Sequence, residues 1–265
     1  MTLPAPDALG SASPSTSALP SLEALISNEN VRVTDNKKHL FRLYWTLDGP
    51  LETAISVMAT SYYDPDAPES AREPYARATS DGGVPTWHPV SKESITHPPV
   101  SSVVVSVREF QDWDEAWMII HEGHSSPSEG GPGWGPAPPP ASGVALATDR
   151  LYFLRCCGED RPWYQEDIKL TVRPSGDLVT IHDYVSQVHP WLMGMRQELV
   201  DASTCVHGNG GDPFPPDTQF MVLAFSNCVS VLPKEEWAAE CSEKMVAPCI
   251  VPYPQPSPLS WGPYE

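Results

Sequence analysis

The sequence is poor in basic residues, with 16 Lys and Arg against 34 Asp and Glu, and its net charge is −18. A chain this acidic repels phosphate backbones and anionic lipid surfaces. We therefore expect no nucleic-acid partner. The sequence also lacks any apolar run of about 18 residues, the least that a membrane-spanning helix needs, so no membrane span is expected.

Residues 1–20 lack the basic and apolar regions of a secretion signal, which predicts a cytoplasmic protein. No CxxC pair occurs among the cysteines, which are Cys156, Cys157, Cys205, Cys228, Cys241 and Cys249. In a cytoplasmic protein such cysteines are expected to be reduced thiols. If Cys156 and Cys157 lie on a strand, their sulfurs point to opposite faces, and both act as small apolar core residues.

Motifs of the common catalytic and nucleotide-binding sites are missing as well. The sequence has no GxSxG, no Ser-x-x-Lys in a credible frame and no P-loop. The glycines Gly208, Gly210 and Gly211 lead into a proline-rich stretch and not into a helix, so they do not form a dinucleotide-binding turn. We therefore expect no cofactor.

Proline is abundant, with 31 residues concentrated in stretches that cannot pack into a core. The expected organisation is a disordered arm, a single domain with two irregular proline-rich insertions, and a proline-rich tail; the ranges are 1–20, 21–246 with insertions at 62–99 and 125–143, and 247–265.

The clearest local pattern runs from strand through turn to helix. Alternating apolar residues predict a strand at 168–172, and a Pro-Ser-Gly-Asp turn follows it. Thr180 and Asp183 have the spacing of a capping box at the start of a helix. An apolar stripe continues from Ile181 to Leu199 through Pro190, which predicts a buried helical face with a bend near His189.

Weaker patterns predict the remaining elements. They are a short helix after Ser21, strands at 40–47, 220–225 and 229–232, helices at 51–58 and 233–245, and two hairpins, one joining 103–110 to 116–121 and one turning at Asp149-Arg150. Strands mostly follow strands, so we predict an α+β fold with a mostly antiparallel sheet and about three helices.

The helical row beside the buried face carries the candidate catalytic residues. His182 and His189 lie on this row with Arg196, and Asp183 is placed to tune a histidine that acts as general base. Trp45, Tyr184 and Trp191 are the aromatic residues expected to line its pocket. The alternative is that the two histidines are polar border residues of a core helix. About 10 Å of helical rise separates them, which excludes a shared metal.

A second histidine pair lies in His121-Glu122-Gly123-His124, predicted at the end of a strand. The metalloprotease pattern needs HExxH on a helix, so this spacing does not match it. A metal here requires a third ligand from elsewhere, for example His97. We expect no metal.

The segment VTIHDYVSQVHPWLMGMRQ, with LTVRPSGD before it and VSVLPKEEW after it, resembles uncharacterised proteins of filamentous fungi. This resemblance covers the C-terminal third and implies no catalytic residues. GVALATDRLYFLR is similar to one hairpin of GRAM and PH-like domains. The strongly acidic chain departs from phosphoinositide binders, so that fold is not transferred.

Two hypotheses about function remain. The first is an accessory or protein-interaction protein of fungal origin, whose partner is another protein. The second is a cofactor-independent cyclase, hydrolase or isomerase of a fungal secondary-metabolite pathway that acts on a small hydrophobic molecule with a histidine base. A closed pocket beside a histidine favours the enzyme, and an exposed apolar patch or sheet edge favours the interaction protein.

Overall fold

A four-stranded sheet lies at the centre of the computed structural model, which describes residues 19–242 except 29, 80–82, 125–132, 137–150, 164 and 209–211. Its strand order is β13 (Lys169–Val172), β8 (Val103–Val107), β15 (Cys228–Pro233) and β14 (Phe220–Ala224). The two outer pairings are antiparallel and the β15–β8 pairing is parallel. The predicted α+β fold with mostly antiparallel sheets is confirmed.

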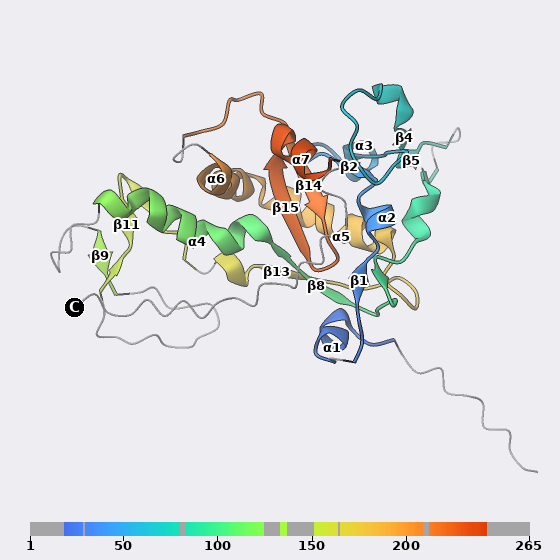
Figure 1. Cartoon of the computed structure of the whole chain (residues 1–265), viewed down its shortest axis with the longest axis horizontal. Coiled ribbons are helices and arrows are strands. Elements are labelled where there is room, and N and C mark those ends of the chain that lie inside the picture. Colours follow the sequence, from blue (N-terminus) through green and yellow to red (C-terminus); the bar gives the residue numbers. More distant parts are fainter. Residues whose placement is uncertain are drawn as a thin grey trace, which may run out of the picture.

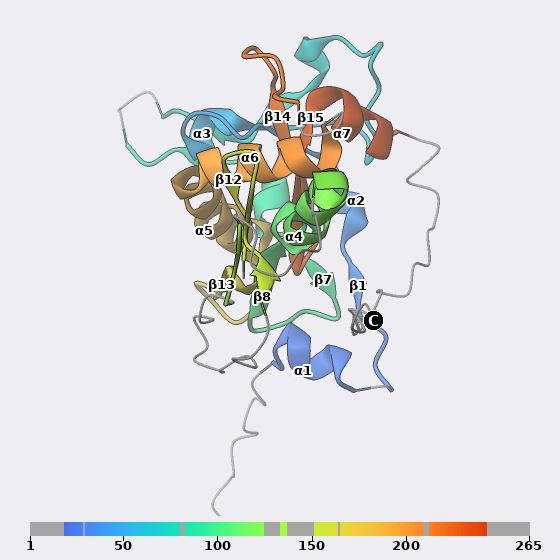
Figure 2. The ribbon, with the colours of Figure 1, turned by 90° about the vertical axis from the view of Figure 1, so that its left-hand side faces the viewer.

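The described residues form seven α-helices, more than the three expected, because several are single turns. They are α1 (Leu22–Ile26), α2 (Lys37–Leu40), α3 (Leu51–Ala54), α4 (Arg108–His121), α5 (Ile181–Gly194), α6 (Arg196–His207) and α7 (Lys234–Glu240). Figure 1 shows α4 extending away from the central sheet, and Figure 2 places α1 and α7 at opposite ends of the molecule. No helix within the described residues has the length and apolar character needed to span a bilayer.

Short strands form the smaller sheets. They pair as β1 (Thr34–Asp35) with β7 (Thr96–His97), β2 (Leu43–Trp45) with β3 (Ile55–Val57) and β4 (Glu73–Pro74), β5 (Ala76–Arg77) with β6 (Thr86–Trp87), β9 (Trp134–Gly135) with β10 (Tyr152–Phe153), and β11 (Arg155–Cys156) with β12 (Glu159–Asp160). Single 3-10 turns lie at η1 (Glu69–Ala71), η2 (Pro89–Lys92), η3 (Glu122–His124) and η4 (Gln165–Asp167). Short elements thus interrupt the segment 62–99, which was predicted to be irregular.

Helix α5 begins as its sequence predicts. The Thr180 hydroxyl accepts from the Asp183 amide, and the Asp183 carboxylate accepts from the Thr180 amide, which completes a capping box. A bend is predicted near His189, but the helix is not interrupted there. It continues through Pro190 to Gly194, and the break follows at Met195 (φ −120°, ψ 25°). Loss of one donor at a proline does not interrupt a helix whose apolar face is buried.

The strand predicted at 116–121 is wrong, since these residues form the second half of α4. The buried side chains of Phe110, Trp117 and His121 are separated by seven and four residues, which is a helical spacing. The segment 111–114, predicted as the turn of a hairpin, lies inside the same helix. Strand β8 therefore leads directly into α4.

Other boundaries also differ from the prediction. The strand predicted at 40–47 is shortened to β2, because Leu40 belongs to α2. The helix predicted after Pro50 ends at Ala54, and Ile55 begins a strand that pairs with β2. The predicted Asp149-Arg150 turn lies outside the described residues, as do residues 1–18, most of 125–143 and the tail. Of the hairpin predicted around that turn, the second strand is described in part as β10, and it pairs with β9.

Candidate metal centre

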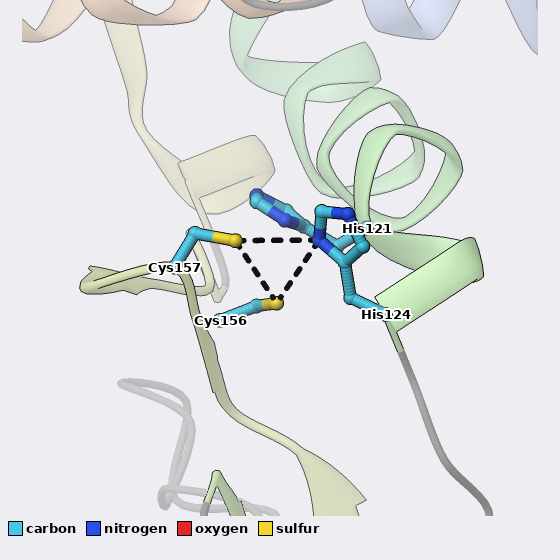
Figure 3. A group of neighbouring side chains, drawn as sticks. All are labelled: His121, His124, Cys156 and Cys157. Carbon is cyan, nitrogen blue, oxygen red and sulfur yellow. Dashed lines mark hydrogen bonds between the residues drawn. The ribbon is translucent and has the colours of Figure 1, made fainter.

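Two imidazoles and two thiols gather beside the C-terminal end of α4. Each of His121, His124, Cys156 and Cys157 offers one potential ligand atom, and the four atoms lie within 4.8 Å of one another. Figure 3 shows the histidines arriving from α4 and η3 and the cysteines from β11 and the turn that follows it. The candidate centre therefore joins two segments about thirty residues apart.

A tight hairpin turn brings the two cysteines together. Strands β11 and β12 are linked by Cys157 and Gly158, which have φ values of 52° and 91°. Positive φ at both central residues is the requirement of a type I′ turn. Cys157 thus leaves the extended conformation, and its Sγ lies 3.7 Å from that of Cys156. The expectation that the two sulfurs point to opposite faces was wrong, because alternation applies only to residues that are both in a strand.

A helical turn brings the two histidines together. His121 is the last residue of α4, and His124 ends the 3-10 turn η3 that follows it. Residues three apart share one side of a helical turn. The H-E-x-H sequence was expected at the end of a strand, where residues three apart point to opposite faces. His97, the third ligand considered from the sequence, lies on β7 and does not belong to the group.

Three of the four ligand atoms already have the spacing of a tetrahedral zinc site. The Nδ1 atom of His124 lies 3.6 Å from Cys156 Sγ and 3.3 Å from Cys157 Sγ. Zinc bonds of about 2.3 Å to sulfur and about 2.0 Å to nitrogen place ligand atoms roughly 3.3 to 3.8 Å apart around a tetrahedron. These three atoms therefore match one face of such a site.

His121 supplies the buried side of the group. Only 5% of its surface is exposed, and its Nδ1 is buried without a hydrogen-bond partner among the described residues. Its Nε2 lies 3.7 Å from the Glu159 carboxylate. A metal-bound histidine usually has a carboxylate or carbonyl beside its second nitrogen, and this arrangement is available to His121.

The strands β9 to β12 form a small unit, here called the β9–β12 lobe, with a separate aromatic cluster. Phe153 lies 5.4 Å from Trp117 and 5.5 Å from Trp134, measured between ring centroids. Trp117 and Phe153 are buried, yet they do not belong to the main hydrophobic core. Among the described residues of the lobe this cluster is small, and units of this size usually need a metal or disulfide for stability.

His189, predicted as a catalytic base, is fully engaged inside the protein. It is 2% exposed; its Nδ1 accepts from the Trp45 indole at 3.0 Å, and its Nε2 donates to the Gly49 carbonyl at 2.9 Å. Neither nitrogen is left for a substrate. This geometry gives His189 a structural role.

His182 and Asp183 are also held by their neighbours. The ring of His182 lies 4.4 Å from Trp87 and its Nδ1 lies 3.3 Å from the Tyr75 hydroxyl, and burial lowers its pKa. Burial acts to raise the pKa of Asp183, but hydrogen bonds from Thr180 and Ser175 outweigh it and hold the pKa below its usual value. Asp183 is therefore a helix cap.

The remaining predicted residues do not form one pocket. Trp45 and Tyr184 are completely buried, and Trp191 is half-buried against the core. Arg196 donates to the Leu47 carbonyl at 3.2 Å and lines a cavity of about 260 Å³. A second, open cavity of about 370 Å³ lies beside Arg161 and Trp163. Neither of these two cavities has His182 or His189 in its wall.

The sequence pairs His121 with His124 but does not show that the two cysteines lie beside them. The signal that was available is the Cys-Gly pair at 157–158, since glycine favours the second central position of a type I′ turn. Comparison of the chain with protein-family models, with curated proteins and with solved structures finds no match.

Proposed function

We propose that this is a zinc-binding protein in which one Zn²⁺, held by His121, His124, Cys156 and Cys157, fastens the β9–β12 lobe to the end of α4. The proposal is carried by the four ligand atoms within 4.8 Å of one another. Two thiolates and two imidazoles in a tetrahedral arrangement are a ligand set that favours zinc over magnesium or calcium.

The role that this site supports is structural. Four protein ligands complete the coordination of zinc, whereas a catalytic zinc keeps one position for water or substrate. The small aromatic cluster around Phe153 gives the lobe little stability of its own. Binding of the metal to the folded form adds its free energy to folding, so zinc supplies what the cluster lacks.

A non-enzymatic accessory role fits this arrangement better than the predicted histidine-dependent enzyme. Both nitrogens of His189 have partners, and His182 is packed among aromatic rings. We propose that a lobe fastened by zinc beside the open cavity at Arg161 presents a surface to a partner protein. The membership of a fungal family and the cytoplasmic location stay predictions from the sequence.

Zinc binding is tested with the purified, reduced full-length chain. We expect about one zinc per chain by elemental analysis, and a Co²⁺-substituted form with the intense visible bands of tetrahedral, thiolate-bound cobalt. Cys157→Ser and His124→Ala each remove a direct ligand. Loss of a residue that only hydrogen-bonds to a metal ligand weakens metal binding by up to about 100-fold. Loss of a direct ligand should therefore weaken zinc binding by more than about 100-fold.

Two substitutions of the same kinds serve as controls. They are Cys205→Ser and His97→Ala. Cys205 lies on α6 and His97 on β7, and neither residue belongs to the group of four. Both controls should bind zinc like the unmodified chain. The proposal is wrong if the reduced protein binds no zinc, or if the ligand variants and the controls bind equally.

A further inference from the structure

We propose that the zinc centre is a thiol redox switch, in which a peroxide oxidises Cys156 and Cys157 to a disulfide between neighbouring residues and the zinc leaves. This inference rests on the proposed zinc binding. It concerns the regulation of the same site, and it follows from the placement and exposure of the two sulfurs.

The type I′ turn sets the two sulfurs at a distance from which they can bond. They are 3.7 Å apart in the reduced form, and a disulfide bond is about 2.05 Å long. Rotation of the two side chains, with a local adjustment of the turn, closes this gap, and the β11–β12 pairing flanks the turn in the reduced form. Cys156 and Cys157 are the two thiols in the group, so no rearrangement of distant segments is needed.

Oxidants reach the centre from the side of the sulfurs. Cys157 is exposed and Cys156 is half-buried, whereas His121 is buried behind them. An accessible thiolate is the nucleophile that reacts with peroxides, and metal binding keeps both sulfurs in that form. The solvent-facing sulfur of Cys157 is therefore the first site of attack.

The other cysteines of the described chain react less readily. Burial raises the pKa of Cys205 and of Cys228 to about 11, and that of Cys241 to about 12. These thiols are protonated at neutral pH, and a protonated thiol is a poor nucleophile. Selectivity for the pair at the turn rests on geometry. Cys157 is exposed, whereas Cys205 and Cys228 are half-buried and Cys241 is buried. Metal binding would in addition hold both sulfurs of the pair as thiolates.

The reaction consumes one peroxide and two protons from the solvent, and it needs no other reactant. One thiolate of the pair attacks H₂O₂, the O–O bond breaks, and a sulfenic acid forms with release of hydroxide. The second thiolate attacks the sulfenic sulfur, the S–S bond forms, and a second hydroxide leaves. With two protons taken up, the products are one disulfide, two waters and free Zn²⁺; the sulfurs are oxidised and the peroxide is reduced.

The product should be easy to reduce. The Cα atoms of adjacent residues lie about 3.8 Å apart, whereas those of an ordinary disulfide are separated by about 4.4 to 6.8 Å. A disulfide closed between neighbours is therefore strained, and strained disulfides have more oxidising potentials. Reduction restores the two ligands, so the switch is reversible.

The test uses the zinc-loaded full-length chain, and its zinc content is measured before any oxidant is added. Hydrogen peroxide is then supplied, zinc release is followed with a chromogenic chelator, and the intact mass and the peptide masses are recorded. We expect release of about one zinc per chain, in step with the loss of two hydrogens from the peptide that holds Cys156 and Cys157. Dithiothreitol and added zinc should restore the starting state. Cys205→Ser should behave in the same way.

The outcomes separate the two proposals. A chain that holds no zinc before peroxide is added contradicts the proposed function itself. A chain that holds zinc but keeps it through oxidation contradicts only the switch. The switch is equally wrong if zinc is released while the sulfurs become sulfinic acids, or form disulfides with another cysteine or another chain.

Discussion

The indole nitrogen of Trp45 donates a 3.0 Å hydrogen bond to Nδ1 of His189, across 144 residues of sequence. Because Nδ1 accepts, the proton of the neutral ring is on Nε2, which donates to the Gly49 carbonyl. Each of these side chains is buried. These contacts thus connect β2 and the turn before α3 to the middle of α5 through polar groups inside the core.

Removal of this contact should destabilise the fold. His189→Ala leaves the Trp45 donor and the Gly49 acceptor without a partner and opens a cavity, for which we expect a loss of about 3 kcal/mol in the free energy of unfolding. Urea denaturation measures it. His97→Ala, at an exposed site, should cost less than about 0.5 kcal/mol. Equal stability of the two variants would show that the buried contact contributes nothing.

The cap of α5 predicts a second effect, with a defined pH dependence. Asp183 accepts from Thr180 and Ser175, and its pKa is lowered in the folded state. The stability that ionised Asp183 contributes to the fold is therefore complete above its unfolded pKa of about 3.9. This stability is lost as the pH falls through the pKa of the folded state. Asp183→Asn should cost about 1 kcal/mol at pH 7 by urea denaturation, and less in acid. Asp177→Asn, exposed in the preceding turn, should match the unmodified chain at both pH values.

A buried carboxylate network lies between α4, α6 and β15. Glu109 has a completely buried side chain, and it accepts from the Ser230 hydroxyl, the Val231 amide and His207 Nε2. His207 Nδ1 lies 3.2 Å from the Glu236 carboxylate. Burial acts to lower the pKa of His207, but Glu109, Glu236 and the nearby Asp112 outweigh it and raise the pKa. The structure thus favours a protonated imidazole between two acids.

This network predicts that stability falls as the pH rises. The stability that protonated His207 contributes to the fold is complete below its unfolded pKa of about 6.5. This stability is lost as the pH rises through the higher pKa of the folded state. An NMR titration of the histidine Cε1 protons should show a folded pKa above 6.5, lowered by Glu236→Gln. Glu235→Gln, at an exposed position on the same helix, should not change it. A pKa at or below the unfolded value would contradict the proposed geometry.

The helical elements with caps and long apolar stripes could be predicted from the sequence. The capping box of Thr180 and Asp183 and the buried face of α5 are both present as predicted, because short-range chemistry decides them. Elements in which local and tertiary preferences differ were not predicted. Ile55 follows a helical turn, yet pairing with β2 takes it into a strand.

The candidate site could be predicted only in part, because it joins residues that are distant in sequence. His121 and His124 were identified as a pair, but α4 was predicted as a strand, which removed the shared helical side. Cys156 and Cys157 were assigned to opposite strand faces, because the positive φ at Cys157 has no marker except the glycine after it. Local patterns do not reveal that the end of α4 meets the β11–β12 hairpin.

Gly158 supplies a test of the turn that leaves all four ligands in place. Its φ of 91° strains any residue with a side chain, but no atom lies within 4 Å of an added Cβ, so Gly158→Ala costs conformational energy alone. We expect about 1 kcal/mol, hence roughly a fivefold weaker zinc affinity by competition with a chromogenic chelator. Gly158→Asn should lose less, because asparagine tolerates positive φ. Gly176→Ala, where the added Cβ also meets open space, should have no effect. If Gly158→Ala binds zinc as tightly as the unmodified chain, the turn does not set the positions of the two thiols.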